Sequence, residues 1–239
     1  RYKTNIMATV SHEMKNPLHS ILFAIELLFE AVPEQQGKYA TYCEHYQRSK
    51  ILVKDLVRSI DAILFNAKLS ASEYKKNYTR FLIVDLMNEC LHNNQVLCQK
   101  NQNTISTEGD KTLWVQSDRQ LLRYIVDNLL NNAGKFTQGG KIALRWNQLQ
   151  NGGLTIEVQD TGCGMSQQDI EIIFEEFRQI DMSLTRKYQG FGLGLAIVKQ
   201  SAQLLDGHIG VDSAFGKGTL FKVNLPNHLQ VSETVHNAA

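Results

Sequence analysis

Two asparagines and a lysine fall on one side of a segment whose other residues are mostly apolar. Asn128, Asn132 and Lys135 lie four and then three residues apart in the stretch IVDNLLNNAGK, which is the spacing of neighbours on one helix face. Asparagine carbonyl oxygens suit Mg²⁺, and a lysine ammonium suits phosphate oxygens. A polar helix face beside an asparagine cap explains two asparagines in this apolar frame poorly. The spacing therefore predicts a helix that binds a metal and a phosphate.

Three glycine-rich stretches follow, DTGCG at 160–164, GFGLGL at 190–195 and GKGT at 216–219. Glycine lets a backbone adopt positive φ and approach a ligand closely, and the middle stretch runs into a helical pattern whose first N–H groups can bind an anion. Any one stretch could instead be a turn in which glycine serves geometry alone. Asp160 ends an apolar strand pattern, where its carboxylate could accept a hydrogen bond from the amino group of adenine.

The elements that must position these residues alternate between strand and helix from Arg80 onward. Short β-rich runs predict strands at 81–84, 113–116, 141–147, 154–159, 208–213 and 219–225. Helical periodicity predicts helices at about 85–100, 118–134, 167–175 and 193–206. We therefore expect an α/β sandwich of helices on a mixed sheet at 80–226, followed by a tail or linker at 227–239.

The first seventy residues show a different period. Apolar residues recur at helical spacing in LHSILFAIELLF and again from Leu52 to Ile63, and turn residues lie between the two stretches. This pattern predicts an antiparallel helical hairpin, about 4–31 and 38–69, in an all-α domain at 1–70. One hairpin cannot bury both apolar stripes, so we expect a homodimer that completes a four-helix bundle. The polar stretch 71–79 is the expected linker.

Composition narrows the classes of function. The chain has 239 residues, 43% hydrophobic and 21% charged, with a formal net charge of +1, so neither nucleic acid nor a membrane surface is an expected partner. The four cysteines form no C-x-x-C pair, which disfavours a zinc site and fits the cytoplasm. The chain begins Arg1-Tyr2-Lys3, and we interpret it as a fragment of a longer protein that is anchored in the inner membrane.

Five motifs in the second half resemble those of sensor histidine kinases, in the family's order. The stretch NLLNNAGKFT from Asn128 resembles the N-box, DTGCG the G1 box, IFEEFRQ from Ile173 the F-box, GFGLGL the G2 box and GKGT the G3 box. The resemblance implies the Bergerat ATP-binding fold, shared with gyrase and the Hsp90 chaperones. It implies that Asn128 and Asn132 hold Mg²⁺ against ATP, that Lys135 neutralises phosphate and that Asp160 binds adenine.

The resemblance also implies a lid over the nucleotide at about 176–191, with Arg178, Arg186 and Lys187 available to the γ-phosphate, although any of these could be a solvated surface charge. The other residues implied in nucleotide binding are Phe136, Gly162, Gly164, Gly190, Gly192, Leu193, Gly194 and Thr219.

The N-terminal stretch SHEMKNPL from Ser11 resembles the family's H-box. A lone histidine is usually structural, but imidazole is also a good nucleophile near neutral pH. The resemblance implies that His12 accepts the phosphoryl group, that Glu13 is the general base, and that Asn16 positions water when the phosphorylated partner is dephosphorylated. The partner is then the aspartate of a response regulator receiver domain, which could also follow in the same chain as in hybrid kinases.

Three departures from the family pattern leave alternatives open. Lys15-Asn16 replaces the frequent Arg-Thr, Gln189 and Phe191 replace a glycine and a threonine of the G2 box, and Gly134 replaces a side chain of the N-box. The last two departures could slow nucleotide binding, which would favour a weak homologue that regulates another histidine kinase. An ATPase without phosphotransfer is disfavoured because gyrase-like enzymes place a glutamate four residues before the metal asparagine. This chain has Asn128 there, and an amide cannot act as a base.

Overall fold

The computed structural model describes residues 18, 20–29, 39–70, 74–178 and 192–226. These residues fall into two compact units, 1–74 and 75–239. His12, Glu13, Asn16, Arg186, Lys187, Gln189, Gly190 and Phe191 lie outside the described residues. No helix among the described residues is long and apolar enough to cross a bilayer.

The first unit contains two helices, residues 20–29 and α2 at Tyr39–Ser70. Glu26 forms an ion pair with Lys50 at 3.1 Å, and Phe29 stacks on Tyr46 with ring centroids 4.3 Å apart. Later residues of the first helix contact earlier residues of α2, so the two helices run antiparallel. The predicted all-α hairpin is confirmed. Its outward side is unusually apolar, with Phe23 62% and Leu28 70% exposed.

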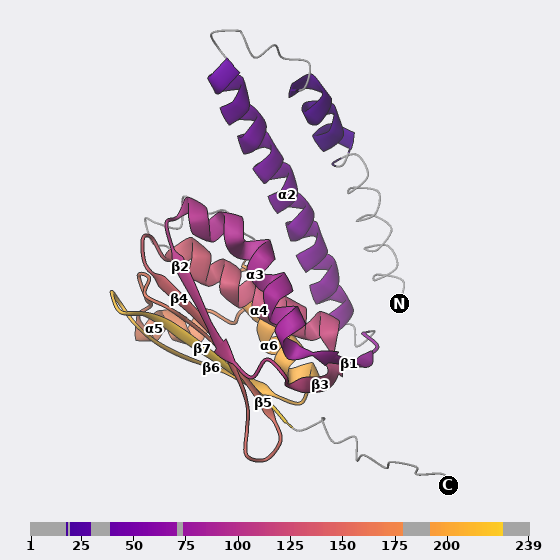
Figure 1. Ribbon diagram of the computed structural model, residues 1–239, viewed down its shortest axis with the longest axis vertical. Helices are drawn as coiled ribbons and strands as arrows, with labels where there is room; N and C mark the ends of the chain where they lie inside the picture. The colour runs from indigo at the N-terminus through magenta and orange to yellow at the C-terminus, as the bar shows by residue number, and fades with distance from the viewer. Residues whose placement is uncertain (1–17, 19, 30–38, 71–73, 179–191, 227–239) are drawn as a thin grey trace. The chain divides into compact units, whose positions relative to one another are not determined.

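The second unit is a sheet with helices on one face (Figure 1). Its five-stranded sheet has the order β2-β4-β5-β7-β6, in which β2 and β4 are parallel and the other neighbours antiparallel. A separate antiparallel pair consists of β1 and β3. The strands are β1 Tyr78–Leu82, β2 Thr104–Gly109, β3 Trp114–Asp118, β4 Lys141–Gln148, β5 Leu154–Asp160, β6 His208–Ala214 and β7 Gly218–Leu225.

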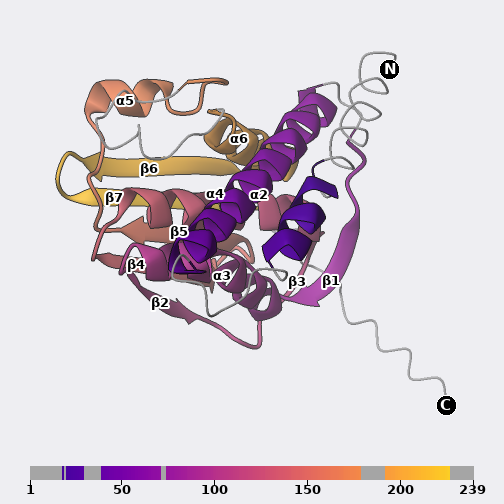
Figure 2. The ribbon, with the colours of Figure 1, turned by 90° about the horizontal axis from the view of Figure 1, so that it is seen from above.

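The helices of this unit are α3 Ile83–Lys100, α4 Arg119–Phe136, α5 Gln167–Ile172 and α6 Gly194–Leu204. Helix α4 lies between α3 and α6 on one face of the sheet (Figures 1 and 2). Apolar residues of α4, spaced three and four apart, pack on the alternate strand residues that face the helices. Leu129 of α4 and Ile156 and Val158 of β5 have no exposed surface. The predicted α/β sandwich is confirmed.

Three details differ from the sequence prediction. The strand expected at 81–84 ends at Leu82, and Ile83 begins α3 with its N–H bonded to the carbonyl of Leu113. Strand β2 was not predicted, because its sequence TISTEG lacks an apolar alternation. Residues 78 and 79, expected in the linker, lie in β1, and the preceding Lys76 donates to the Leu204 carbonyl at 2.9 Å. Each difference comes from pairing with distant residues, which a local pattern does not contain.

Candidate nucleotide site

The end of α4 is where the glycine-rich loops meet the asparagines. A Cβ on Gly162 would collide with the carbonyl oxygen of Phe136, and that oxygen accepts a hydrogen bond from the Cys163 N–H at 3.2 Å. The loop after β5 can therefore lie against the last turn of α4 only with glycine at position 162. This contact brings together the N-box and G1 residues that the sequence predicts.

Asn128 faces the start of α6. Its Nδ2 donates to the Tyr124 carbonyl at 2.7 Å, which leaves Oδ1 directed away from its own helix backbone. A Cβ on Gly194 would lie 2.8 Å from this oxygen, so the glycine keeps the space in front of it open. The N-cap residue of α6 is Leu193, which has no polar side chain to cap the first N–H groups, and such an uncapped helix start suits an anion.

Asn132 and Lys135 follow Asn128 by one and two turns of α4, and all three side chains are half-buried. Amide and ammonium groups on one helix face can supply an oxygen to a cation and a positive charge to a phosphate. No cluster of three His, Cys, Asp or Glu that could hold a metal ion occurs among the described residues.

Asp160 is buried at the end of β5, with 6% of its surface exposed. Its Oδ1 accepts a hydrogen bond from the Gly162 N–H at 2.8 Å. Burial raises the pKa of the Asp160 carboxyl, and the amides of Gly162 and Thr219 and the nearby Thr137 hydroxyl hold that rise down. A carboxylate whose burial is incompletely offset is suited to accept a hydrogen bond from a ligand amino group.

Thr137 is a polar residue of the site that the sequence analysis did not select. Its side chain is completely buried, and its Oγ1 lies close enough to Asp160 to lower the pKa of that carboxyl, without a well-formed hydrogen bond to any other described residue. A buried hydroxyl beside a buried carboxylate fits a nucleobase that would bond to both groups. Its position directly after the N-box helix was the signal that could have indicated it.

The G3 residues lie beside Asp160, at the start of β7 and in the turn before it. Thr219 lies directly across from Asp160 in the β5–β7 register, and its Oγ1 is 2.9 Å from the Ser213 hydroxyl. A Cβ on Gly218, whose φ is +87°, would collide with the carbonyl of Asp160, and one on Gly164, at +63°, would collide with that of Ala214. These glycines allow the G1 loop and the β6–β7 hairpin to pack directly on each other.

Arg178 lies at the end of the F-box segment, beside Gly192. The Phe177 N–H donates to the Gly192 carbonyl at 3.1 Å, so the F-box segment and the G2 segment are in direct contact here. Arg178 forms an exposed ion pair with Glu175 at 3.0 Å. The backbone of Arg178 therefore lies against Gly192, while its exposed guanidinium is paired with a carboxylate.

Gly134 has a packing explanation. A Cβ there would lie 3.2 Å from Cys98 Sγ and 3.2 Å from Leu97 Cδ2, so the missing side chain admits α3. Its carbonyl accepts hydrogen bonds from Asn101 and Asn103 of the turn after α3, at 2.7 and 3.3 Å. The glycine at position 134, where the family pattern has a side chain, is therefore explained by the close packing of α3 against α4.

Comparison with known proteins agrees with this geometry. Residues 117–229 match the model for the histidine kinase-, DNA gyrase B-, and HSP90-like ATPase, and residues 2–70 match that for the His Kinase A (phospho-acceptor) domain. The chain belongs to the sensor histidine kinase family. The ATPase match supports binding of ATP.

Several curated relatives resemble nearly the whole chain. Identity is 31% to the autoinducer 2 sensor kinase/phosphatase LuxQ of Vibrio cholerae, over 96% of this chain and 27% of LuxQ. It is 35% to the circadian input-output histidine kinase CikA of Thermosynechococcus vestitus, over 95% and 31%. The chain thus spans well under half the length of these relatives. Among solved structures, full-length ShkA in complex with AMPPNP has a TM-score of 0.74 at 26% identity, over 95% of this chain and 46% of ShkA.

Proposed function

We propose that this histidine kinase chain transfers the γ-phosphoryl group of ATP to His12. The observation that carries the proposal is the side chain of Asn128, an amide whose nitrogen is already bonded to the Tyr124 carbonyl. Neither atom of this amide can remove a proton from water, so the site is suited to hold ATP for a separate nucleophile. That nucleophile is an imidazole nitrogen of His12.

The proposed roles of the site residues follow from their positions. Asp160 and Thr219 bind adenine with Gly162 and Gly164, and Lys135 and the start of α6 at Leu193 and Gly194 bind phosphate oxygens. Phe136 forms one wall, and Arg178, beside Gly192, exchanges Glu175 for phosphate. Gly190 is assigned to phosphate binding from the sequence motif alone. Mg²⁺, when bound through Asn128 and Asn132, supplies charge neutralisation between the phosphates.

In the proposed reaction the imidazole nitrogen forms a bond to the γ-phosphorus as the bond from that phosphorus to the β–γ bridging oxygen breaks. ADP leaves with the electron pair of the broken bond. The remaining imidazole proton passes to Glu13. Phosphotransfer to an aspartate of a receiver domain follows. Asn16 positions water when the phosphorylated receiver domain is later dephosphorylated by hydrolysis.

Assembly as a homodimer is proposed from the exposed apolar side of the helical unit, where Ile21, Leu27 and Leu52 are 49, 50 and 59% exposed. A second copy would cover this side as a four-helix bundle. The proposed domains are 1–70 for dimerisation and phospho-acceptance, 71–79 as linker, 80–226 for ATP binding and 227–239 as tail or linker. We place the chain in the cytoplasm, within a protein anchored in the inner membrane.

The test is incubation with γ-labelled ATP, followed by acid and alkali treatment. We expect label that is acid-labile and alkali-stable, as phosphohistidine is, and its loss in His12→Gln while ATP affinity stays within about twofold. Label retained in His12→Gln would identify another acceptor. Intact ATP binding without any label would instead favour the regulatory homologue.

A further inference from the structure

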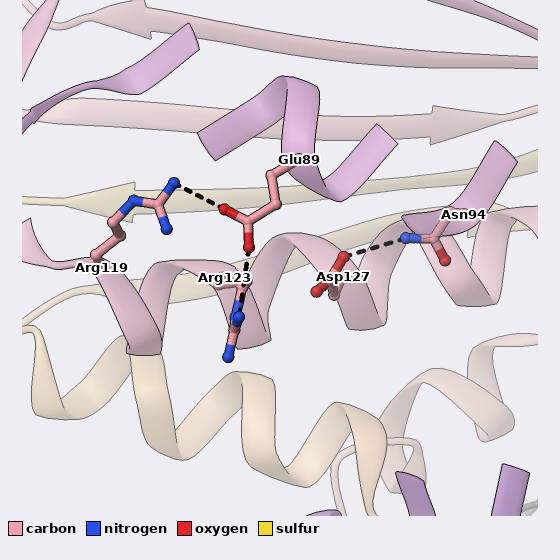
Figure 3. A network of polar contacts seen from close by, with 5 residues as sticks. All are labelled: Glu89, Asn94, Arg119, Arg123 and Asp127. Atoms are coloured by element: carbon pink, nitrogen blue, oxygen red, sulfur yellow. Dashed lines mark hydrogen bonds and ion pairs between the residues drawn. The ribbon is translucent and has the colours of Figure 1, made fainter. Parts of the chain in front are cut away.

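One side of α4 carries polar residues that contact α3 (Figure 3). Arg119, Arg123, Asp127 and Asn131 recur every four residues and so form one stripe along the helix. At the N-terminal end of the stripe, Glu89 of α3 binds Arg119 at 2.7 Å and Arg123 at 3.3 Å. These are half-exposed ion pairs that tie the two helices together.

At the other end of the stripe, Asn94 of α3 takes the place of Glu89. This side chain is 4% exposed, and its Nδ2 donates to Asp127 Oδ1 at 3.2 Å and to the Cys90 carbonyl at 2.8 Å. Its Oδ1 accepts from Asn131 Nδ2 at 3.5 Å. Asn94 thus bonds to two successive turns of α4 while its own helix holds it in place.

The residues that Asn94 holds stand next to the proposed metal ligands. Asp127 immediately precedes Asn128, and Asn131 immediately precedes Asn132, so each contact is displaced by about 100° around the helix from a ligand. We propose that Asn94 is a positioning residue, which sets the rotation of α4 through Asp127 and Asn131 and so directs Asn128 and Asn132 toward Mg²⁺. This inference rests on the metal role given to the two asparagines under the proposed function.

The geometry of magnesium makes such a device effective. A rotation of about 10° moves a Cα at ~2.3 Å from the helix axis by roughly 0.4 Å, and it moves side-chain atoms farther. Mg²⁺ requires oxygen ligands at about 2.0–2.1 Å in nearly ideal octahedral arrangement. Apolar packing against α3 and the sheet tolerates a shift of that size better than a coordination sphere does.

The buried polar groups also favour a single setting of the helix. Asn94 is buried, and its amide bonds to Asp127 at 3.2 Å and to Asn131 at 3.5 Å. A rotation that separated Asp127 and Asn131 from Asn94 would break both hydrogen bonds of this buried amide to α4. We call the hydrogen bonds of Asn94 to Asp127 and Asn131 the Asn94 clamp. The clamp favours one rotation of α4 in addition to stabilising its contact with α3.

The experiment compares the affinity of the whole chain for ATP with Mg²⁺ and with EDTA, by titration calorimetry. We expect wild type to gain affinity from Mg²⁺, and Asn94→Ala to lose about tenfold of that gain, as for outer-shell partners of a metal site. Affinity in EDTA should stay within about twofold. Asp127→Asn, which keeps an acceptor for Asn94, should retain the gain, and Asp127→Ala should lose it and serves if Asn94→Ala does not fold.

Glu89→Gln is the matched control, because it weakens the same pair of helices away from the ligands. It should lower thermal stability while leaving the Mg²⁺-dependent gain unchanged. A gain that survives in folded Asn94→Ala and Asp127→Ala, or that falls equally in Glu89→Gln, overturns the positioning role alone. A wild-type chain without any gain from Mg²⁺ overturns the metal assignment of Asn128 and Asn132, and this inference with it.

Discussion

Asp118 and Asp160 are both buried aspartates at the last position of a strand, and their carboxylates have different surroundings. Asp118 ends β3, is 1% exposed and is the N-cap of α4. Its Oδ1 accepts from the N–H groups of Gln120 and Leu121 at 3.0 and 3.1 Å, and its Oδ2 accepts from the Asn77 N–H at 2.7 Å. Backbone donors therefore reach both of its oxygens.

Asp160 ends β5 and is also surrounded by donors, but they do not offset its burial. The Gly162 N–H reaches its Oδ1 at 2.8 Å, and the Thr219 amide and the Thr137 hydroxyl lie beside it, yet burial still raises the pKa of its carboxyl. A structural carboxylate and a binding one therefore differ in what their donors achieve. The amides that bond to Asp118 hold the start of α4, whereas the donors around Asp160 do not fully offset its burial, which favours an added hydrogen bond from a ligand.

The largest effect should come from Asp160→Ala on nucleotide affinity. Loss of a buried, charge-assisted hydrogen bond to adenine should weaken ATP binding by roughly 10- to 100-fold. Titration calorimetry at fixed Mg²⁺ measures it, with Asp118→Ala as the matched variant that should stay within about threefold when folded. Equal affinity losses in the two variants would remove the distinction between the two aspartates.

The next effect is the stability of Asp118→Ala. Loss of the N-cap should lower the free energy of unfolding by about 1–2 kcal/mol, because the amides of Gln120, Leu121 and Asn77 lose their acceptor. Both tryptophans of the chain, Trp114 and Trp146, lie in the second unit, so urea denaturation followed by their fluorescence reports this unit selectively. A cost below that of Asp160→Ala would contradict the structural role of Asp118.

The surroundings of Asp118 also show how much of the fold could be predicted from the sequence. The helix that carries Asn128 and Asn132 was predicted from its period, since an amphipathic helix on a sheet leaves a clear 3.6-residue signal. The prediction placed Asp118 at the start of this helix, but the bond from Asn77 was not foreseeable, because 71–79 has a linker's composition. Strand β2 also escaped prediction, since a polar edge strand is defined by its pairing with β4.

In the candidate site, too, some residues could be predicted from the sequence and others could not. Motif order indicated Asp160 and Thr219, and the place of Thr137 after the N-box helix was a weaker signal, because only the fold shows that its hydroxyl is buried beside Asp160. The clamp of Asn94 was equally hidden, since its partners Asp127 and Asn131 lie more than thirty residues away in the chain. Local patterns predict which face of a helix is polar, whereas long-range contacts determine what that face does.

The smallest effect is a pH-dependent gain in stability from Asp160→Asn. Because the folded-state pKa of Asp160 is raised above its unfolded value, ionisation of this carboxyl costs stability, fully so at pH above the folded pKa. The cost disappears as pH falls through the folded pKa toward the unfolded one, near 3.9. The amide variant has no such cost, so near neutral pH it should unfold at a temperature a few degrees higher than wild type.

The decisive quantity is the difference in unfolding free energy between Asp160→Asn and wild type at a series of pH values. Other titrating groups are common to both chains and cancel, so the difference should be positive near pH 7 and shrink on acidification. Saturating ATP should reverse it near neutral pH, because bound nucleotide stabilises only the chain that binds it tightly. A difference that is constant with pH would mean that the Asp160 carboxylate is already satisfied by its own chain, as Asp118 is, and has nothing in reserve for adenine.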